Sequence, residues 1–96
     1  MSESTSVMPG GWTSFNSPLT AKATSVFEAA QKQLLGVKYT PFAFAEQLVA
    51  GTNYCFLCTA HVVGPVQNGF AAEVSVYVPL KGDPHVTGIK RLMPGH

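Results

Sequence analysis

The stretch Thr52-Asn-Tyr-Cys-Phe-Leu-Cys-Thr-Ala-His-Val-Val63, TNYCFLCTAHVV, decides the fold class. Successive side chains of a β-strand point to opposite faces, so alternating residue character predicts a strand here. One face would carry Tyr54, Phe56, Cys58, Ala60 and Val62. The other face would carry Asn53, Cys55, Leu57, Thr59 and His61. We expect the first face to point into the core.

An apolar helix stripe precedes this strand. Apolar residues recur at helical spacing at Leu19, Ala23, Val26, Phe27, Ala30 and Leu34. Proline is tolerated near a helix start, and Gly36 can take the left-handed conformation that follows a helix end. The pattern therefore predicts one amphipathic helix between Pro18 and Gly36.

Three further strands are expected around the alternating one. Tyr39–Val49 is rich in aromatic and β-branched residues, and Pro41 within it indicates an edge position or a bulge, because proline cannot donate to a ladder. Turn residues between 64 and 69 lead to an alternating run from Phe70 to Val78. A turn at 81–84 then precedes the last strand, His85–Leu92. One helix and four hairpin-connected strands predict an α+β domain whose antiparallel sheet wraps around the helix.

The composition fits one small domain with a nearly neutral surface. The chain has 96 residues, of which 46% are hydrophobic and 11% charged, with a net charge of +1. No basic cluster could follow a phosphate backbone or an anionic membrane, and no apolar run could span a bilayer. Residues 1–7 are polar and include an acid, unlike a signal peptide. We expect a cytosolic protein without nucleic-acid or membrane partners; non-classical export or a removed signal peptide are the alternatives.

Catalytic or metal chemistry finds little support in the sequence. Cys55 and Cys58 have C-x-x-C spacing, but no second pair follows and the histidines are scattered. An offset of three on one strand sends the two thiols to opposite faces, which predicts two unlinked cysteines, one buried and one nearer solvent. The acids are dispersed, so no carboxylate pair is indicated. A dyad of either cysteine with His61 remains the one catalytic alternative.

Three motifs resemble the stefins, the type 1 cystatins. They are Met8-Pro-Gly-Gly-Trp12, Gln47-Leu-Val-Ala-Gly-Thr-Asn-Tyr54 and Thr87-Gly88. The hallmark of the family, Gln-x-Val-x-Gly, is matched by Gln47, Val49 and Gly51. The resemblance extends from Met8 to about Arg91, and it implies a cystatin-like fold of four to five strands for residues 8–96, preceded by a polar extension at 1–7.

The resemblance implies a reversible, tight-binding inhibitor of papain-like, cathepsin-type cysteine proteases, with no cofactor and no catalytic residue of its own. In the family an N-terminal segment and two hairpin loops fill the active-site cleft. Leu48, Val49 and Ala50 would supply uncharged contacts, since a buried charge costs desolvation energy, and Gly51 would supply the freedom for the turn. Met8 and Pro9 would reach the non-primed subsites, and Gly10 and Gly11 would let the chain turn away.

The second loop departs from the family pattern. One alignment places Leu80 and Gly82 on the Leu-Pro-Gly tip of the family, with Lys81 in place of the proline, and a shifted register brings in Val78-Pro79. The loop is shorter in either register. Pro79, Leu80 and Lys81 are the expected contacts. Trp12 is either a further protease contact or an aromatic packed on the sheet, which is the more frequent arrangement.

Two alternatives from other functional classes stay open. One is a non-inhibitory protein-binding module on the same fold, and the other is the thiol enzyme named above. The expected state of the inhibitor is a monomer. Because the turn at Leu48–Gly51 lacks the Asn-Gly or Asp-Gly of a specified hairpin, straightening of the two strands could also give a domain-swapped dimer, a tendency that stefins share.

Overall fold

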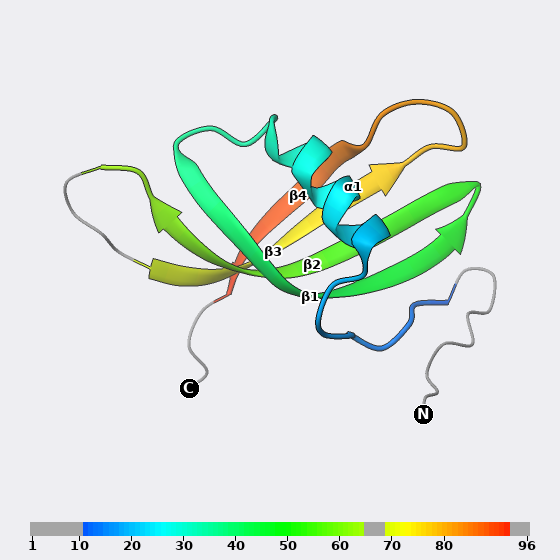
Figure 1. The fold of residues 1–96 in the computed structure, drawn as a ribbon, viewed down its shortest axis with the longest axis horizontal. Coiled ribbons are helices and arrows are strands. Elements are labelled where there is room, and N and C mark those ends of the chain that lie inside the picture. Colours follow the sequence, from blue (N-terminus) through cyan, green and yellow to red (C-terminus); the bar gives the residue numbers. More distant parts are fainter. Residues whose placement is uncertain (1–10, 65–68, 93–96) are drawn as a thin grey trace.

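The computed structural model describes residues 11–64 and 69–92, which form one helix packed on a four-stranded sheet (Figure 1). Helix α1 spans Ala21–Gln31, and strands β1 to β4 span Val37–Val49, Gly51–Val62, Gly69–Val78 and His85–Leu92. The sheet order is β1-β2-β3-β4, and each neighbouring pair is antiparallel. The expected α+β architecture is confirmed, with four strands in the described part of the chain.

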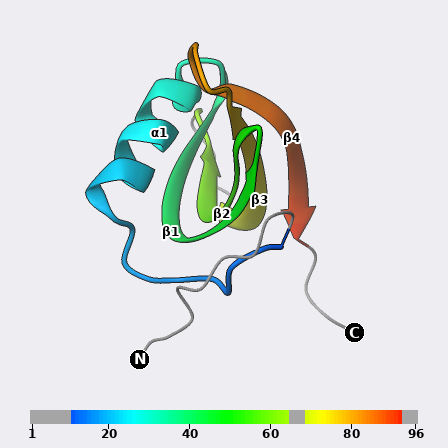
Figure 2. The same ribbon diagram turned by 90° about the vertical axis from the view of Figure 1, so that its right-hand side faces the viewer.

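Helix α1 lies against one face of the curved sheet (Figure 2). Phe27 of the helix meets Phe56 of β2 edge to face, with ring centroids 5.0 Å apart, and Phe56 stacks on Tyr54 at 5.6 Å. Such aromatic pairs are worth about 0.5–1.5 kcal/mol beyond their buried area. The face of β2 that was predicted to point inward is buried at Tyr54, Phe56, Cys58 and Ala60. Val62 lies on the same face, but it is not buried as expected, because β2 extends past the core there and leaves Val62 43% exposed.

The helix is shorter than its apolar stripe predicted. It begins after Thr20, whose hydroxyl accepts a hydrogen bond from the Ala23 amide at 3.1 Å, as an N-cap does. Leu19 and Leu34 lie outside the helix yet still pack against the core. Gly36 has the expected positive φ, 82°, but it uses this conformation in the link to β1 rather than at the helix end.

Strand β1 has the edge position and the bulge that Pro41 predicted. The register with β2 shifts between Pro41 and Ala43, so Phe42 has no partner. Outside β1, the segment 12–16 runs alongside as two isolated antiparallel bridges, Trp12 with Gln47 and Asn16 with Phe44. The segment thereby covers part of an edge that would otherwise present unpaired backbone groups.

Candidate functional site

Both predicted hairpin loops lie at one end of the sheet. The β1–β2 connection falls there, and because Thr52 of β2 pairs with Val78 of β3, the loop that follows Val78 starts beside it (Figure 1). The bridge between Trp12 and Gln47 brings the start of the described chain to the same place. We call this part of the molecule, residues 11–12, 47–51 and 77–84, the loop end.

The first loop, Leu48 to Ala50, is tight, apolar and exposed. Val49 pairs with Gly51, so Ala50 alone separates β1 from β2. Leu48 is 50% exposed and Val49 42%, and Ala50 is also exposed. At the base of the loop, the Asn53 side-chain amide donates to Oε1 of Gln47 at 2.9 Å. The hairpin therefore presents uncharged side chains from a braced pair of strands.

Gly51 is buried rather than exposed at the tip. Its φ is +101°, a conformation that costs an L-residue with a Cβ free energy. A Cβ at this position would lie 2.8 Å from the hydroxyl oxygen of Tyr77 and closer still to the carbonyl oxygen of Val78. Glycine is thus required twice, for its backbone conformation and for the close approach of β3.

Sequence reasoning missed two residues that hold the loops. The Tyr77 hydroxyl donates a hydrogen bond to the carbonyl oxygen of Ala50 in the first loop. Gln33, just past the helix, donates from Nε2 to the Pro84 carbonyl and accepts at Oε1 from the Val86 amide, each at 2.9 Å. The only sequence signal was weak: Tyr77 and Gln33 are polar residues next to predicted apolar positions.

The second loop, residues 79–84, is wider and more polar than the first. Leu80 is 81% exposed, Lys81 is also exposed, and Pro79 is half-buried. Of the predicted N-terminal contacts, Gly11 lies at the loop end beside Trp12, whereas Met8, Pro9 and Gly10 lie outside the described residues. The described site residues are thus brought together from three separate parts of the chain.

Trp12 lies over the outer face of the sheet. With Thr13, Phe15, Ala45, Cys55, Glu73 and Ser75 it lines a hollow of about 350 Å³. Its side chain remains 50% exposed. Trp12 therefore packs on the outer face of the sheet and remains half-exposed, and a contact with a protease stays a prediction.

The two thiols occupy opposite faces of β2, as predicted. Both are free, with Cys58 in the core and Cys55 half-buried on the outer face. Burial, with a smaller effect of Glu73, raises the pKa of Cys55 to about 11, and burial together with Cys55 raises the pKa of Cys58 to about 12. Both thiols are therefore protonated at neutral pH. A cysteine nucleophile must be a thiolate, so neither side chain is in its reactive form.

The geometry does not support a thiol dyad with His61. Cys55 and His61 share the outer face of β2, but they are six positions apart, roughly 20 Å along a strand. Cys58 lies on the opposite face from His61. Within residues 11–64 and 69–92, no group of three or more His, Cys, Asp or Glu could hold a metal ion. No helix in that part of the chain combines the length and apolar character needed to cross a membrane.

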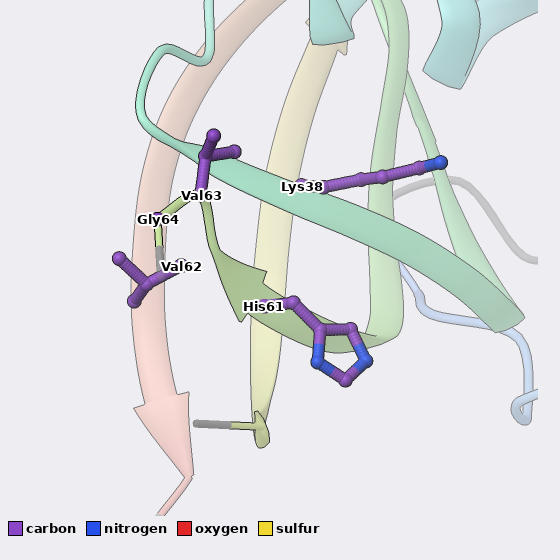
Figure 3. A pocket seen from close by; sticks show the side chains of 5 residues that line it. All are labelled: Lys38, His61, Val62, Val63 and Gly64. Carbon is purple, nitrogen blue, oxygen red and sulfur yellow. The ribbon is translucent and has the colours of Figure 1, made fainter. Parts of the chain in front are cut away.

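A second hollow, of about 420 Å³, lies far from the loop end. Figure 3 shows its lining residues, Lys38, His61, Val62, Val63 and Gly64. Lys38 and His61 are register partners between β1 and β2, at the opposite end of these strands from the first loop. None of the predicted protease contacts lines this hollow.

No protein-family model matches the sequence, and neither the curated proteins nor the solved structures searched contain a match.

Proposed function

We propose that this protein is a reversible, non-covalent inhibitor of papain-like cysteine proteases with a cystatin-like fold, and that its loop end enters the active-site cleft. One observation carries the proposal. Exposed, uncharged side chains of the first loop, Leu48 and Val49, lie at the same end of the sheet as the exposed Leu80 of the second loop. These are the positions that the resemblance to stefins assigns to the protease contact.

The exposed apolar side chains of the two loops could contribute substantially to the binding free energy. Full burial of a Leu or Val side chain is worth about 1.5–3 kcal/mol, so burying the exposed parts of Leu48, Val49 and Leu80 would contribute about 4 kcal/mol. This corresponds to roughly a thousandfold in affinity before binding costs are subtracted. The loops alone would then give moderate affinity, to which contacts of the N-terminal segment would add.

The chemistry of the loop end favours simple obstruction of the cleft. The first loop has no ionisable side chain, so entering a narrow cleft would leave no charge unpaired. The two thiols belong to β2 and to neither loop, and they stay protonated at neutral pH, which disfavours the thiol-enzyme alternative.

Titration of papain with the purified protein tests the proposal. We expect loss of peptidase activity that recovers on dilution, and no effect on a serine protease assayed alongside. A double variant, Cys55→Ser with Cys58→Ala, should inhibit like the parent. No inhibition of papain or of related endo- and exopeptidases at micromolar protein would contradict the proposal and favour the non-inhibitory binding module.

A further inference from the structure

The first loop is fastened to a strand that is distant in the sequence. Ala50, the one residue between β1 and β2, accepts a hydrogen bond from the hydroxyl of Tyr77, 27 residues later on β3. The bond lies in an exposed part of the surface. A connection without Asn-Gly or Asp-Gly has little turn chemistry of its own, so contacts from outside the loop must help to hold the bend.

The ring of Tyr77 also lies close to the next residue. A Cβ at Gly51 would be 3.0 Å from Cε1 of Tyr77 and 2.8 Å from its hydroxyl oxygen. Only a residue without a side chain lets the ring approach the backbone so closely. Tyr77 therefore contacts two consecutive residues of the bend, through its hydroxyl at Ala50 and its ring at Gly51.

We propose that Tyr77 is a positioning residue for the first loop. Its hydroxyl fixes the Ala50 carbonyl, so the bend that exposes Leu48 and Val49 is ordered before any partner binds. The consequence for inhibition rests on the proposed function, whereas the ordering of the loop does not. Preordering a binding loop improves affinity because less conformational freedom is lost on binding.

Tyr77 also links the two loops. It stands one residue before Val78, whose carbonyl approaches Gly51 and after which the second loop begins. A shift of the β3 end would therefore move the contacts of Ala50 and Gly51 at the same time. The pairing of Thr52 with Val78 sets the two loops side by side, and the side chain of Tyr77 adds a contact to the bend of the first loop from the strand that leads into the second.

The test is Tyr77→Phe, which removes a single exposed hydroxyl and keeps the ring on Gly51. Tyr39→Phe is the matched control, because Tyr39 pairs with Ala60 toward the other end of β1 and β2. In the parent and both variants we would measure amide hydrogen exchange of residues 48–52, the carbonyl carbon shift of Ala50, the melting temperature and the inhibition constant for papain.

For Tyr77→Phe we expect exchange at residues 48–52 to accelerate about threefold to tenfold, a shifted Ala50 carbonyl signal, and an inhibition constant raised by a similar factor. Tyr39→Phe should change none of these.

Unchanged exchange and an unchanged Ala50 signal would overturn the positioning role. Faster exchange with unaltered inhibition would overturn its importance for binding. A parent that fails to inhibit papain would overturn the proposed function alone, because exchange still decides whether Tyr77 orders the loop.

Discussion

The two loops at the loop end are held in shape by different contacts. In the first, Ala50 alone joins two paired strands, Gly51 is buried against β3, and no side chain is charged. In the second, six residues, 79–84, separate β3 from β4, and Lys81 and Asp83 are exposed. The first loop takes its shape from the sheet beneath it. The second is held at its far end by the side chain of Gln33.

This contrast predicts different tolerance to change. A loop shaped by close backbone packing has no room for an added atom, whereas a loop held by one side-chain clamp can adjust its tip. Four experiments test this difference between the loops.

The largest effect should come from Gly51→Ala. The positive φ and the approach of Val78 and Tyr77 together should lower the free energy of unfolding by about 2–4 kcal/mol, measured by urea denaturation. Gly36→Ala is the matched control, because Gly36 also has a positive φ but nothing within 4 Å of a Cβ, and it should cost about 1 kcal/mol. Gly82→Ala, in the second loop, should cost more than Gly36→Ala but less than Gly51→Ala, because a Cβ there would lie 3.2 Å from Cγ of Pro79 and would meet no backbone atom. Equal losses at all three positions would show that close packing at Gly51 is unimportant.

The sequence was informative where the signals are local. Alternation located β2 and β3, residue character located β1 and a turn signal located β4, each to within two residues at either end, and Pro41 indicated the bulge of β1. Helical periodicity overestimated α1, because apolar spacing reports burial, and Leu19 and Leu34 are partly buried without being helical. Val62 lies on the predicted face but is exposed for a related reason: alternation assigns a face, but only the fold determines how far the core extends along it.

Local sequence patterns could not predict the contacts that hold the loops. Tyr77 and Ala50 are 27 residues apart, and Gln33 is 51 and 53 residues from its two partners. Such pairs become visible only when the strand order and register are known. The sequence also suggested Gly51 for its conformational freedom, while the close approach of β3 emerged from the structure.

The second prediction compares charge in the two loops. Val49→Glu places a carboxylate in a loop that cannot move aside, so the inhibition constant for papain should rise about tenfold or more. Lys81→Glu, in the wider loop, replaces one exposed charge with another that can turn to solvent, and we expect about threefold or less. Val63→Glu is the control, since Val63 is 73% exposed at the opposite end of β2. A larger effect at Lys81 than at Val49 would reverse the proposed ranking of the loops.

The third prediction asks whether the loops act alone. Deleting residues 1–7 should leave inhibition within about twofold of the parent, because the resemblance places the first protease contacts at Met8 and Pro9. Deleting residues 1–10 removes those apolar contacts and should weaken inhibition about fivefold to tenfold. The measurement is the inhibition constant of each truncated protein for papain, after circular dichroism has shown that the protein is folded. If both inhibit equally, the hairpins form the entire contact surface.

The smallest effect should follow loss of the second-loop clamp. Gln33→Ala removes the hydrogen bonds to Pro84 and Val86, which are exposed and so should together contribute only about 1 kcal/mol to the free energy of unfolding. Amide exchange at Val86 should accelerate, because its acceptor is lost, whereas exchange in the first loop should not change, because Tyr77 still holds Ala50. The adjacent Lys32→Ala, also exposed, serves as the control. Since the second loop can adjust its tip, inhibition should weaken by about threefold or less. A loss of inhibition as large as that of Val49→Glu would mean that the second loop needs a fixed shape too, and the contrast between the two loops would no longer hold.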